Sequence, residues 1–444
     1  MFDMNGKYTT AKIMIDNVEE SCVGQITMFL NHPAFTNPIA IMPDTHAGKG
    51  SVIGFTMKMT DKIIPNVVGV DIGCGMLSAN IGRVGIGSHD EVDSIIRNHV
   101  PFGTSVHHHQ SFNMKKDFPW KEVNETARLF FMKYSDEFKV KVEFPTYDID
   151  WIISKCIQIG MSYERFVKSV GSLGGGNHYC EIGKSIVTKD KWLTVHTGSR
   201  NFGKQVCEYW QRRAFDNMHK KKDIELQLKI DEIKLKYPSN EVQNRIKAEK
   251  DILGYGIQTN GLEWLDGVDS VGYLTDMIFA QAYSKVNRHE IIDIICNNLN
   301  WEGTDSVESI HNFIDFNDFM IRKGAIRSYE NERMIIPFNM RDGMLICKGY
   351  SNPEWNYSAP HGAGRVLSRN KAKEVLNLDK FEKQMENVYS TSVCRGTLDE
   401  SPDAYKDPEI IKEAIRPTCE IIDQVIPIHN LKDGSSAKPR GKKR

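Results

Sequence analysis

Several features that would place a protein in a specialised class are missing from this 444-residue sequence. No run approaches the roughly 18 consecutive apolar residues that a membrane-spanning helix needs. The first residues, MFDMNGKYTT, contain no hydrophobic segment of a signal peptide. The nine cysteines include no CxxC pair, and an odd, unpatterned set in a chain this long is typical of reduced thiols. We therefore expect a cytoplasmic protein with no membrane association.

The chain also lacks an excess of charge of either sign. Lys and Arg number 57, Asp and Glu number 58, and the net charge is −1. This balance excludes a uniformly basic surface for nucleic acid, although it allows a local basic groove. Hydrophobic residues make up 40% of the chain and charged residues 26%, which excludes a fully disordered protein and allows a large core.

No internal repeat and no long Pro- or Ser-rich linker divides the sequence. Short Val- and Ile-rich segments that end at Gly, Pro or Asp are typical of strands. The region 87–170 is mainly helical in pattern, and the mixture of short strands, glycine turns and helices predicts a single complex α/β domain. The segments predicted to form strands are 39–42, 52–57, 67–72, 179–196 and 333–348.

One segment, 204–251, differs from the rest because it is dense in Lys, Glu, Asp and Gln. Its apolar residues recur at helical spacing, and Pro238 interrupts the pattern. We predict two amphipathic helices that form an antiparallel arm within residues 204–255. Two interpretations stay open, a solvated helical insertion and an arm that grips RNA or a partner. The spaced apolar residues are Leu226, Ile230, Ile233, Val242 and Ile246.

The chain ends in AKPRGKKR, where five of the last seven residues are basic. Residues 435–444 are therefore predicted to be a disordered tail. Such a tail either adds non-specific affinity for phosphate backbones or serves only solubility.

Residue types that carry chemistry concentrate in a few glycine-rich segments. Backbone amides in such turns can face a phosphate without obstruction from side chains. The run GSLGGGNH is not a P-loop, because no Lys-Ser/Thr follows it. Each segment alone is also compatible with a simple tight turn. The segments are MPDTHAGKG (42–50), VGVDIGCGM (68–76), GSLGGGNHYCEI (171–182), VHTGSRNFG (195–203) and SAPHGAGRVLSR (358–369).

One carboxylate, one thiol and two of the candidate imidazoles lie in these segments, and His311, followed by Asn312, adds a third imidazole. Such mixed ligands suit manganese, iron, cobalt or zinc better than magnesium, which prefers oxygen. His361, in HGAGR, has small neighbours, and its imidazole is a candidate nucleophile, general base or metal ligand. Arg200, Lys323, Arg365 and Arg369 add cationic groups for phosphates. Together they predict a metal-assisted phosphoryl or nucleotidyl transfer site. The candidate metal ligands are Asp71, Cys74, His178, His196 and His311.

The ordered motifs PDTHAGKG, DIGCG, GGGNHYCE, HTGSR, HN, RKGA, HGAGR and AYKD resemble the RtcB family of GTP-dependent RNA ligases, from about residue 42 to about residue 432. The resemblance implies an α/β (α+β) catalytic domain over 1–434, with central β-sheets flanked by helices and the arm inserted in it. It implies that the chain joins RNA 3′-phosphate or 2′,3′-cyclic phosphate ends to 5′-hydroxyl ends in tRNA splicing or RNA repair. The implied cofactors are GTP and two Mn²⁺ ions. The implied partners are tRNA halves or other cleaved RNA and an archease-type activator, and we expect a monomer.

The resemblance also implies roles for individual residues. His361 would attack the α-phosphate of GTP and carry GMP, which then passes to the RNA 3′-phosphate to give an RNA–ppG end. Asp44 is a second catalytic candidate. The five candidate metal ligands would hold manganese, with Cys74 able to bridge two ions. Arg200, Lys323, Arg365 and Arg369 would hold RNA or nucleotide phosphates. The implied nucleotide contacts are Asn177 to phosphate, Glu181 to guanine N1 and N2, Tyr405 by stacking, Lys432 to guanine O6, and Ala363 and Gly364 beside His361.

The sequence departs from the family at IPFNMRDG (336–343), where many members read IPGSMG. We expect Phe338 and Asn339 to reshape the nucleotide pocket. Three alternatives to the ligase stay open: a metal-dependent phosphoesterase that uses the same metal and arginine cluster, an RNA 3′-end guanylyltransferase without ligation, and a non-catalytic binder of RNA ends that uses a basic groove.

Overall fold

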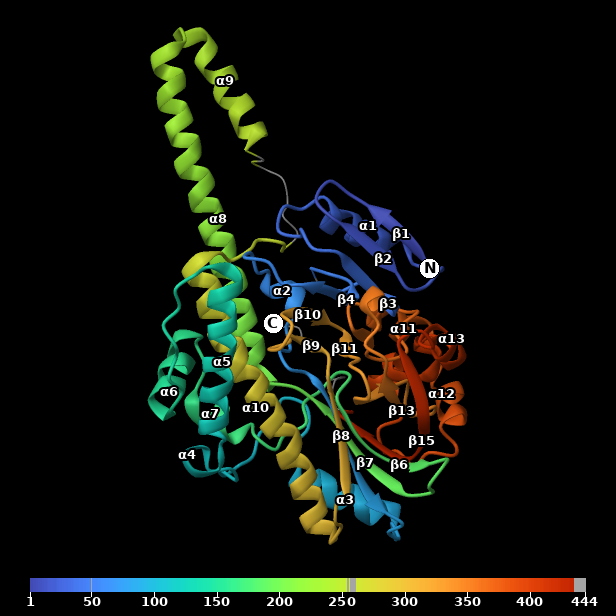
Figure 1. Ribbon diagram of the computed structural model, residues 1–444. Helices are drawn as coiled ribbons and strands as arrows, with labels where there is room; N and C mark the ends of the chain where they lie inside the picture. The colour runs from blue at the N-terminus through green and yellow to red at the C-terminus, as the bar shows by residue number, and fades with distance from the viewer. Residues whose placement is uncertain (49, 254, 256–260, 435–444) are drawn as a thin grey trace, which may run out of the picture.

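The computed structural model describes residues 1–434 except 49, 254 and 256–260. The predicted tail at 435–444 lies outside the described residues. Within this part of the chain the strands form three sheets, and helices pack around them (Figure 1). The predicted α/β fold class with a helical hairpin is confirmed. No helix among the described residues is long and apolar enough to cross a membrane.

The first sheet has six strands in the order β1-β2-β3-β4-β10-β9. Neighbouring strands run antiparallel, except that β2 and β3 are parallel. Its side chains Ile41, Phe55 and Ile321 belong to the largest hydrophobic core. The strands are β1 Phe2–Asn5, β2 Thr10–Ile13, β3 Ile39–His46, β4 Ile53–Lys58, β9 Asn312–Ile314 and β10 Met320–Lys323.

The second large sheet has seven antiparallel strands in the order β12-β13-β15-β6-β7-β5-β8. It brings together segments that are far apart in the sequence, because β5, β6 and β7, which overlap three of the glycine-rich motif segments, are neighbours in it. A third sheet pairs only β11 Ala325–Arg327 with β14 Ser358–Pro360. The seven strands are β5 Gly75–Gly82, β6 Tyr179–Ser185, β7 Lys191–Thr197, β8 Asp305–Ile310, β12 Arg333–Pro337, β13 Met344–Gly349 and β15 Cys419–Lys432.

The helices flank these sheets, and the longest helix in the body, α10, contacts β5, β7, α3, α5 and α8. Its buried residues cover most of its circumference, as expected for a helix in the interior. The α-helices are α1 Glu20–Leu30, α2 Pro65–Val68, α3 His89–His99, α4 Met114–Asp117, α5 Trp120–Phe138, α6 Ile149–Gln158, α7 Tyr163–Lys168, α8 Arg200–Lys236, α9 Ser239–Ile252, α10 Gly267–Leu299, α11 Arg369–Val375, α12 Leu378–Gln384 and α13 Pro408–Ala414. Short 3₁₀ helices span Pro353–Trp355, Arg395–Glu400 and Pro402–Ala404.

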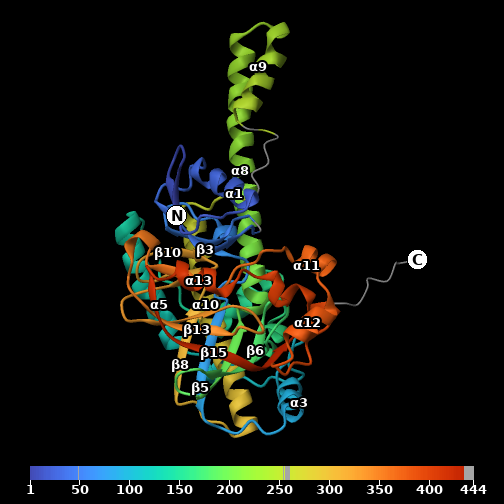
Figure 2. The same cartoon turned by 90° about the vertical axis from the view of Figure 1, so that its right-hand side faces the viewer.

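The arm is a helical hairpin of the outer part of α8 and of α9, and it projects from the body (Figures 1 and 2). The helix α8 begins at Arg200 inside the body, where Phe202 and Trp210 are buried. The two helices are separated at Pro238, as predicted from the sequence. The outer part of α8 buries only Leu226 and Ile233, and α9 buries no residue.

Most of the strand predictions are confirmed, but the one at 67–72 is wrong. Here the chain forms the short helix α2 and then a turn. Pro65 occupies the first turn of this helix, where a missing N–H costs nothing. Gly69 (φ 115°) and Gly73 (φ 72°) then turn the chain toward β5. A fully buried apolar run has no periodicity that separates a short helix from a strand.

Candidate active site

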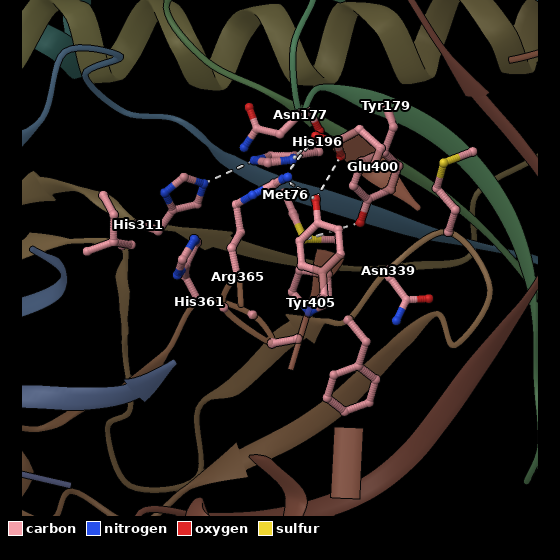
Figure 3. A pocket seen from close by; sticks show the side chains of 18 of the residues that line it. Met76, Asn177, Tyr179, His196, His311, Asn339, His361, Arg365, Glu400 and Tyr405 are labelled. Atoms are coloured by element: carbon pink, nitrogen blue, oxygen red, sulfur yellow. Dashed lines mark hydrogen bonds and ion pairs between the residues drawn. The ribbon is translucent and has the colours of Figure 1, made fainter. Parts of the chain in front are cut away.

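A cavity of about 250 Å³ lies between the two large sheets (Figure 3). The six-stranded sheet contributes His46 and Ile53, and the seven-stranded sheet contributes Tyr179, His196 and Lys432. The loop that follows β14, with His361 to Arg365, and the segment with Glu400 and Tyr405 close the remaining side. The cavity is therefore lined by segments from residue 46 to residue 432.

Five potential metal donors meet at one edge of this cavity. Cys74 is central, because its Sγ lies 3.5 Å from His178 Nε2 and 3.4 Å from His196 Nε2. The Nε2 atoms of His196 and His311 are 3.0 Å apart, and Asp71 Oδ2 lies 3.1 Å from His178 Nε2. The donors form two groups that share Cys74, namely Cys74–His196–His311 and Asp71–Cys74–His178.

Strand pairing explains why these donors converge. Met76 in β5 pairs with His196 in β7, and Tyr179 in β6 pairs with the same His196. Gly75 pairs with Ile310, the residue before His311. Donors that occupy paired positions, or lie next to them, at one end of neighbouring strands are close in space.

Hydrogen bonds to backbone carbonyls orient two of the imidazoles. His178 Nδ1 lies 3.0 Å from the Leu173 carbonyl oxygen, and His196 Nδ1 lies 3.2 Å from the Asn177 carbonyl oxygen. A carbonyl oxygen only accepts, so each Nδ1 carries a proton and each Nε2 faces the cluster. This arrangement is typical of metal-binding histidines.

The electrostatics of the cluster also fit a cation. Burial, together with neighbouring imidazoles, holds the pKa values of His196 and His311 well below the usual value, so both rings are neutral. Burial and the Asp71 carboxylate raise the pKa of the Cys74 thiol well above its usual value. Burial works to raise the pKa of Asp71, but His178 and Arg200 outweigh it and the pKa is lowered. Neutral imidazoles, an ionised carboxylate and a thiol that a metal would deprotonate match a borderline or soft divalent ion.

His361 lies next to this cluster, with its ring centroid 4.8 Å from that of His311. Its Nδ1 is 2.6 Å from Asp44 Oδ2, and the same oxygen accepts from the backbone N–H groups of His361 (3.1 Å) and Gly362 (3.2 Å). Nδ1 is therefore the protonated nitrogen, and Nε2 presents its lone pair. The loop can approach Asp44 this closely because residue 364 is glycine, where a Cβ would lie 2.1 Å from the Asp44 carbonyl oxygen.

A network of buried charged and polar groups forms the other end of the cavity. Lys432 Nζ lies 2.7 Å from Glu400 Oε2, which also accepts from the Tyr405 hydroxyl at 2.8 Å. Burial works to raise the pKa of Glu400, but Lys432, Arg369 and Arg365 outweigh it and keep the carboxylate ionised. The Arg365 guanidinium lies over the Tyr405 ring, 5.0 Å from its centroid.

Glu181 is the second carboxyl group at this end. Its Oε2 accepts a 2.7 Å hydrogen bond from Asn430 Nδ2. Burial raises the pKa of Glu181 to about 8, although Asn430 and Lys432 act in the opposite direction. The cavity thus has an ionised, paired carboxylate in Glu400 and a carboxyl group in Glu181 that titrates near neutral pH.

Known proteins resemble this chain over nearly its whole length. The family model described as "tRNA-splicing ligase RtcB" matches residues 25–433. The chain belongs to the RtcB family. It is 28% identical over 432 residues to the RNA-splicing ligase RtcB of Escherichia coli K12, covering 91% of this chain and 92% of that protein. It is 25% identical over 472 residues to the tRNA-splicing ligase RtcB of Nanoarchaeum equitans, covering 93% and 91%.

Most residues that the RtcB resemblance singled out lie at the cavity. His361 lines it, and Asp44 lies directly behind His361. Asp71, Cys74 and His178 complete the metal donor group beside it. The other predicted residues that line the cavity are Asn177, Glu181, His196, His311, Ala363, Gly364, Arg365, Arg369, Tyr405 and Lys432.

Two of the predicted phosphate-binding residues lie elsewhere. Lys323 is buried and donates from Nζ to the carbonyl oxygens of Asn66 (2.9 Å) and Ser51 (3.4 Å). Arg200 lines a second cavity of about 450 Å³ together with Asp71 and His178. The candidate metal donors Asp71 and His178 therefore lie between two cavities.

The second cavity carries more basic groups than acidic ones. Arg165 and Lys204 line it beside Arg200, and Asp71 is its only acidic lining residue among those the structure describes. Arg200 donates from Nε to Ser172 Oγ and from one terminal nitrogen to the Gly103 carbonyl oxygen, both at 2.9 Å. These bonds hold the guanidinium in place beside His178.

Among the lining residues without a role in the sequence-based prediction are His46, Glu400 and Asn430. Burial lowers the pKa of His46 to about 4, so its ring is neutral. The sequence carries a signal for Asn430, because it lies two positions before Lys432 in β15 and so faces the same side of the strand. Glu400 lies five residues before Tyr405 in an irregular segment, where no periodicity indicates its direction.

The family departure at 336–343 lies at the cavity wall, where Phe338, Asn339 and Met340 are lining residues. Phe338 is only 4% exposed and packs in a core cluster with Ala363 and Tyr405. The Asn339 amide donates to Asp342 Oδ2 at 2.7 Å, and its oxygen accepts from the N–H groups of Arg341 and Asp342. Phe338 thus forms part of the cavity wall, and Asn339 stabilises the turn at 339–342.

Proposed function

We propose that the chain is an RNA ligase that uses GTP and manganese to join RNA 3′-phosphate or 2′,3′-cyclic phosphate ends to 5′-hydroxyl ends. The family of the chain is a ligase family. The observation that carries the proposal is the geometry of His361, whose Nδ1 proton is held by Asp44 while Nε2 is free beside the metal donor group. An imidazole held in one tautomer beside bound cations is suited to nucleophilic attack on phosphorus.

In the first step His361 Nε2 attacks the α-phosphorus of GTP. A nitrogen–phosphorus bond forms, the bond to the β-phosphate oxygen breaks, and pyrophosphate leaves. Asp44 stabilises the positive charge that develops on the ring, because its carboxylate accepts the Nδ1–H hydrogen bond. The product is His361 that carries GMP.

In the later steps an oxygen of the RNA 3′-phosphate attacks this phosphorus and releases His361, which gives the RNA–ppG end. The 5′-hydroxyl then attacks the RNA 3′-phosphorus, and GMP leaves. A cyclic phosphate is first opened by water. Manganese ions would be held by Asp71, Cys74, His178, His196 and His311, and would neutralise phosphate charge and lower the pKa of a bound water or hydroxyl.

Guanine is the base we propose for the far end of the cavity. An ionised Glu181 can accept from guanine N1–H and N2–H₂, a pair of donors that adenine lacks. Lys432 donates to guanine O6, and its amine is held by Glu400 at 2.7 Å. Tyr405 stacks on the base, while Asn177, Ala363 and Gly364 contact the nucleotide phosphates and ribose.

For the RNA we propose that Arg365 and Arg369 act in the first cavity and Arg200 in the second. Arg200 shares the second cavity with the donors Asp71 and His178, so a phosphate bound there would lie beside the metal group. Lys323 is left out of this set, because its ammonium group already donates to two backbone carbonyls.

We further propose that residues 1–434 act as one catalytic domain, with the arm at 204–255 as an insertion, in a monomeric cytoplasmic enzyme. All nine cysteines are free in the structure, which supports a reducing compartment. An archease-type activator is the partner we propose for the guanylylation step.

One labelling experiment tests the reaction. Purified protein is incubated with α-³²P-GTP and Mn²⁺, beside His361→Ala and a control with Mg²⁺ only. We expect acid-labile, base-stable label on the wild-type protein that is absent from the variant. Adding RNA with a 3′-phosphate and a 5′-hydroxyl end then separates ligation from guanylylation alone. Label that persists in His361→Ala would contradict the proposal, and phosphate release without any label would favour the phosphoesterase.

A further inference from the structure

Three buried polar residues on α10 face the loops that carry the metal donors. Ser284 and Asn287 are fully buried, and Arg288 is 1% exposed. They are spaced i, i+3 and i+4, so they form one patch on a single face of the helix. A buried guanidinium is unfavourable unless its donors are satisfied, so its partners indicate what the patch does.

Arg288 donates to the backbone next to two candidate metal donors, before Cys74 and after His196. One terminal nitrogen donates to the carbonyl oxygens of Gly73 (2.7 Å) and Thr197 (3.1 Å). Gly73 directly precedes Cys74, and Thr197 directly follows His196. The Nε atom donates to Glu308 at 2.8 Å, three residues before His311 in the sequence.

Asn287 holds the segment before a further donor. Its Oδ1 accepts from the backbone N–H groups of Gly171 (2.9 Å) and Ser172 (3.2 Å), and its Nδ2 donates to the Ser172 carbonyl oxygen at 3.2 Å. The next residue, Leu173, supplies the carbonyl that orients His178. The same Nδ2 lies 3.2 Å from the Gly198 carbonyl oxygen, in the loop after His196.

Ser284 completes the patch where the loop before Cys74 approaches α10 most closely. Its Oγ donates to the Gly73 carbonyl oxygen at 2.5 Å and accepts from Arg288 at 2.7 Å. Gly73 has φ 72°, and a Cβ there would lie 3.0 Å from Ser284 Cβ and 3.1 Å from the backbone of Gln281. The loop before Cys74 therefore lies directly on α10, without a side chain between them.

We propose that Ser284, Asn287 and Arg288 are positioning residues that set the spacing of Cys74, His178 and His196 and thereby the affinity for the metal. This inference rests on the proposed function, because it requires that the donor group binds a cation. Three bonds of the patch go to backbone carbonyls next to a donor residue, at Gly73 and Thr197. The bonds of Asn287 go to the backbone that leads to His178 and to the loop that follows His196. The neighbouring buried residue Gln281 bonds instead to the Ile314 carbonyl oxygen in β9 and to Met277.

The test measures metal binding rather than catalysis. Co²⁺ is titrated into the metal-free full-length protein, and the thiolate-to-cobalt absorption of Cys74 and the dissociation constant are recorded. For Arg288→Met and Asn287→Leu we expect affinity lower by about 10- to 100-fold, the usual effect of removing a residue that orients metal ligands. Arg288→Lys should rescue only partly, because a compact ammonium cannot serve Gly73, Thr197 and Glu308 together.

Gln281→Met is the matched control, because it also removes a buried polar group from α10 but not from this patch. Denaturant unfolding of every variant in EDTA shows whether the metal-free fold is retained. Ser284→Ala is the mildest change, and its Co²⁺ affinity is measured if Arg288→Met does not fold. Wild-type affinity in Asn287→Leu and Arg288→Met, or an equal loss in Gln281→Met, would overturn the proposal. Absence of the thiolate-to-cobalt absorption from the wild-type protein would refute the proposed metal centre itself. That result is distinct from a loss of Co²⁺ affinity confined to the variants, which supports the positioning role.

Discussion

The arm and the cavity of this protein use charged residues in opposite ways. On the arm, Arg245 pairs with Glu241 at 2.8 Å while about half of each side chain stays exposed. At the cavity, Lys432 pairs with Glu400 at 2.7 Å, and both side chains are almost completely buried. Exposed pairs contribute little to stability, whereas buried charges need their partners. The same residue types therefore mark a solvated helix in one region and a binding site in the other.

The apolar residues of the two regions differ as well. Leu228 and Leu235 on the arm are 66% and 91% exposed, while the cavity residues Phe338 and Ala363 are 4% and 1% exposed. Helical spacing is sufficient to build the arm. The cavity depends on contacts between segments that are hundreds of residues apart.

The largest effect is expected for the shared metal donor. Cys74→Ala should abolish guanylylation, because both donor groups lose their common ligand. The matched control is Cys156→Ala, which removes a buried thiol from α6 that belongs to neither donor group. Labelling with α-³²P-GTP at low Mn²⁺ measures both. Normal labelling of Cys74→Ala would remove this residue from the metal site.

A smaller but still large effect is expected behind the nucleophile. Asp44→Asn keeps the shape of the side chain but weakens its hold on the Nδ1 proton of His361. We expect the rate of guanylylation to fall by about 10²- to 10⁴-fold, by analogy with other carboxylates that orient a catalytic histidine. Single-turnover labelling measures this rate, with His361→Ala as the floor. A rate within threefold of the wild type would show that Asp44 is dispensable.

The direct comparison of the two regions is a pair of identical substitutions. Glu400→Gln leaves the Lys432 ammonium buried without a charged partner and should lower the free energy of unfolding by up to about 3 kcal/mol. Glu241→Gln removes an exposed arm pair and should cost less than about 0.5 kcal/mol. Denaturant unfolding at matched salt measures both. Equal losses would refute the distinction drawn between cavity and arm.

The pH dependence of nucleotide binding sharpens the role of Glu181. Its pKa is about 8 in the free protein, and only the ionised form accepts two hydrogen bonds from guanine. Binding must therefore release a proton below pH 8, so the affinity for GTP should rise by up to about tenfold per pH unit from pH 6 to pH 8 and then level off. Calorimetry in buffers of different ionisation enthalpy measures the released proton. In Glu181→Gln the affinity should be lower, and this slope should be absent.

The smallest effect is expected on the arm. Leu228→Ser removes an apolar side chain that is already 66% exposed, so guanylylation should stay within about twofold and the free energy of unfolding within about 0.5 kcal/mol. If RNA ligation falls while guanylylation does not, the arm contacts RNA, which is the second interpretation of this segment.

Much of the fold could be predicted because its signals are local. Helical spacing and Pro238 located the two arm helices, and short apolar runs between Gly and Pro located β3, β4 and β6. The exception at 67–72 has a physical cause, since a short apolar run has no periodicity that distinguishes a strand from a helix. Local pattern also carried no information about Glu400, which lies in a 3₁₀ segment.

The sequence by itself determined which chemical groups this protein has: the donors Asp71 and Cys74, the histidines, and the nucleophile candidate His361 among small residues. Only the tertiary structure decided how they act, because reactivity depends on contacts between residues far apart in the chain. Asp44 meets His361 across 317 positions and thereby leaves Nε2 free. Strand pairing in the seven-stranded sheet gathers the donors, α10 holds their loops, and Arg200 faces a different cavity from Arg365.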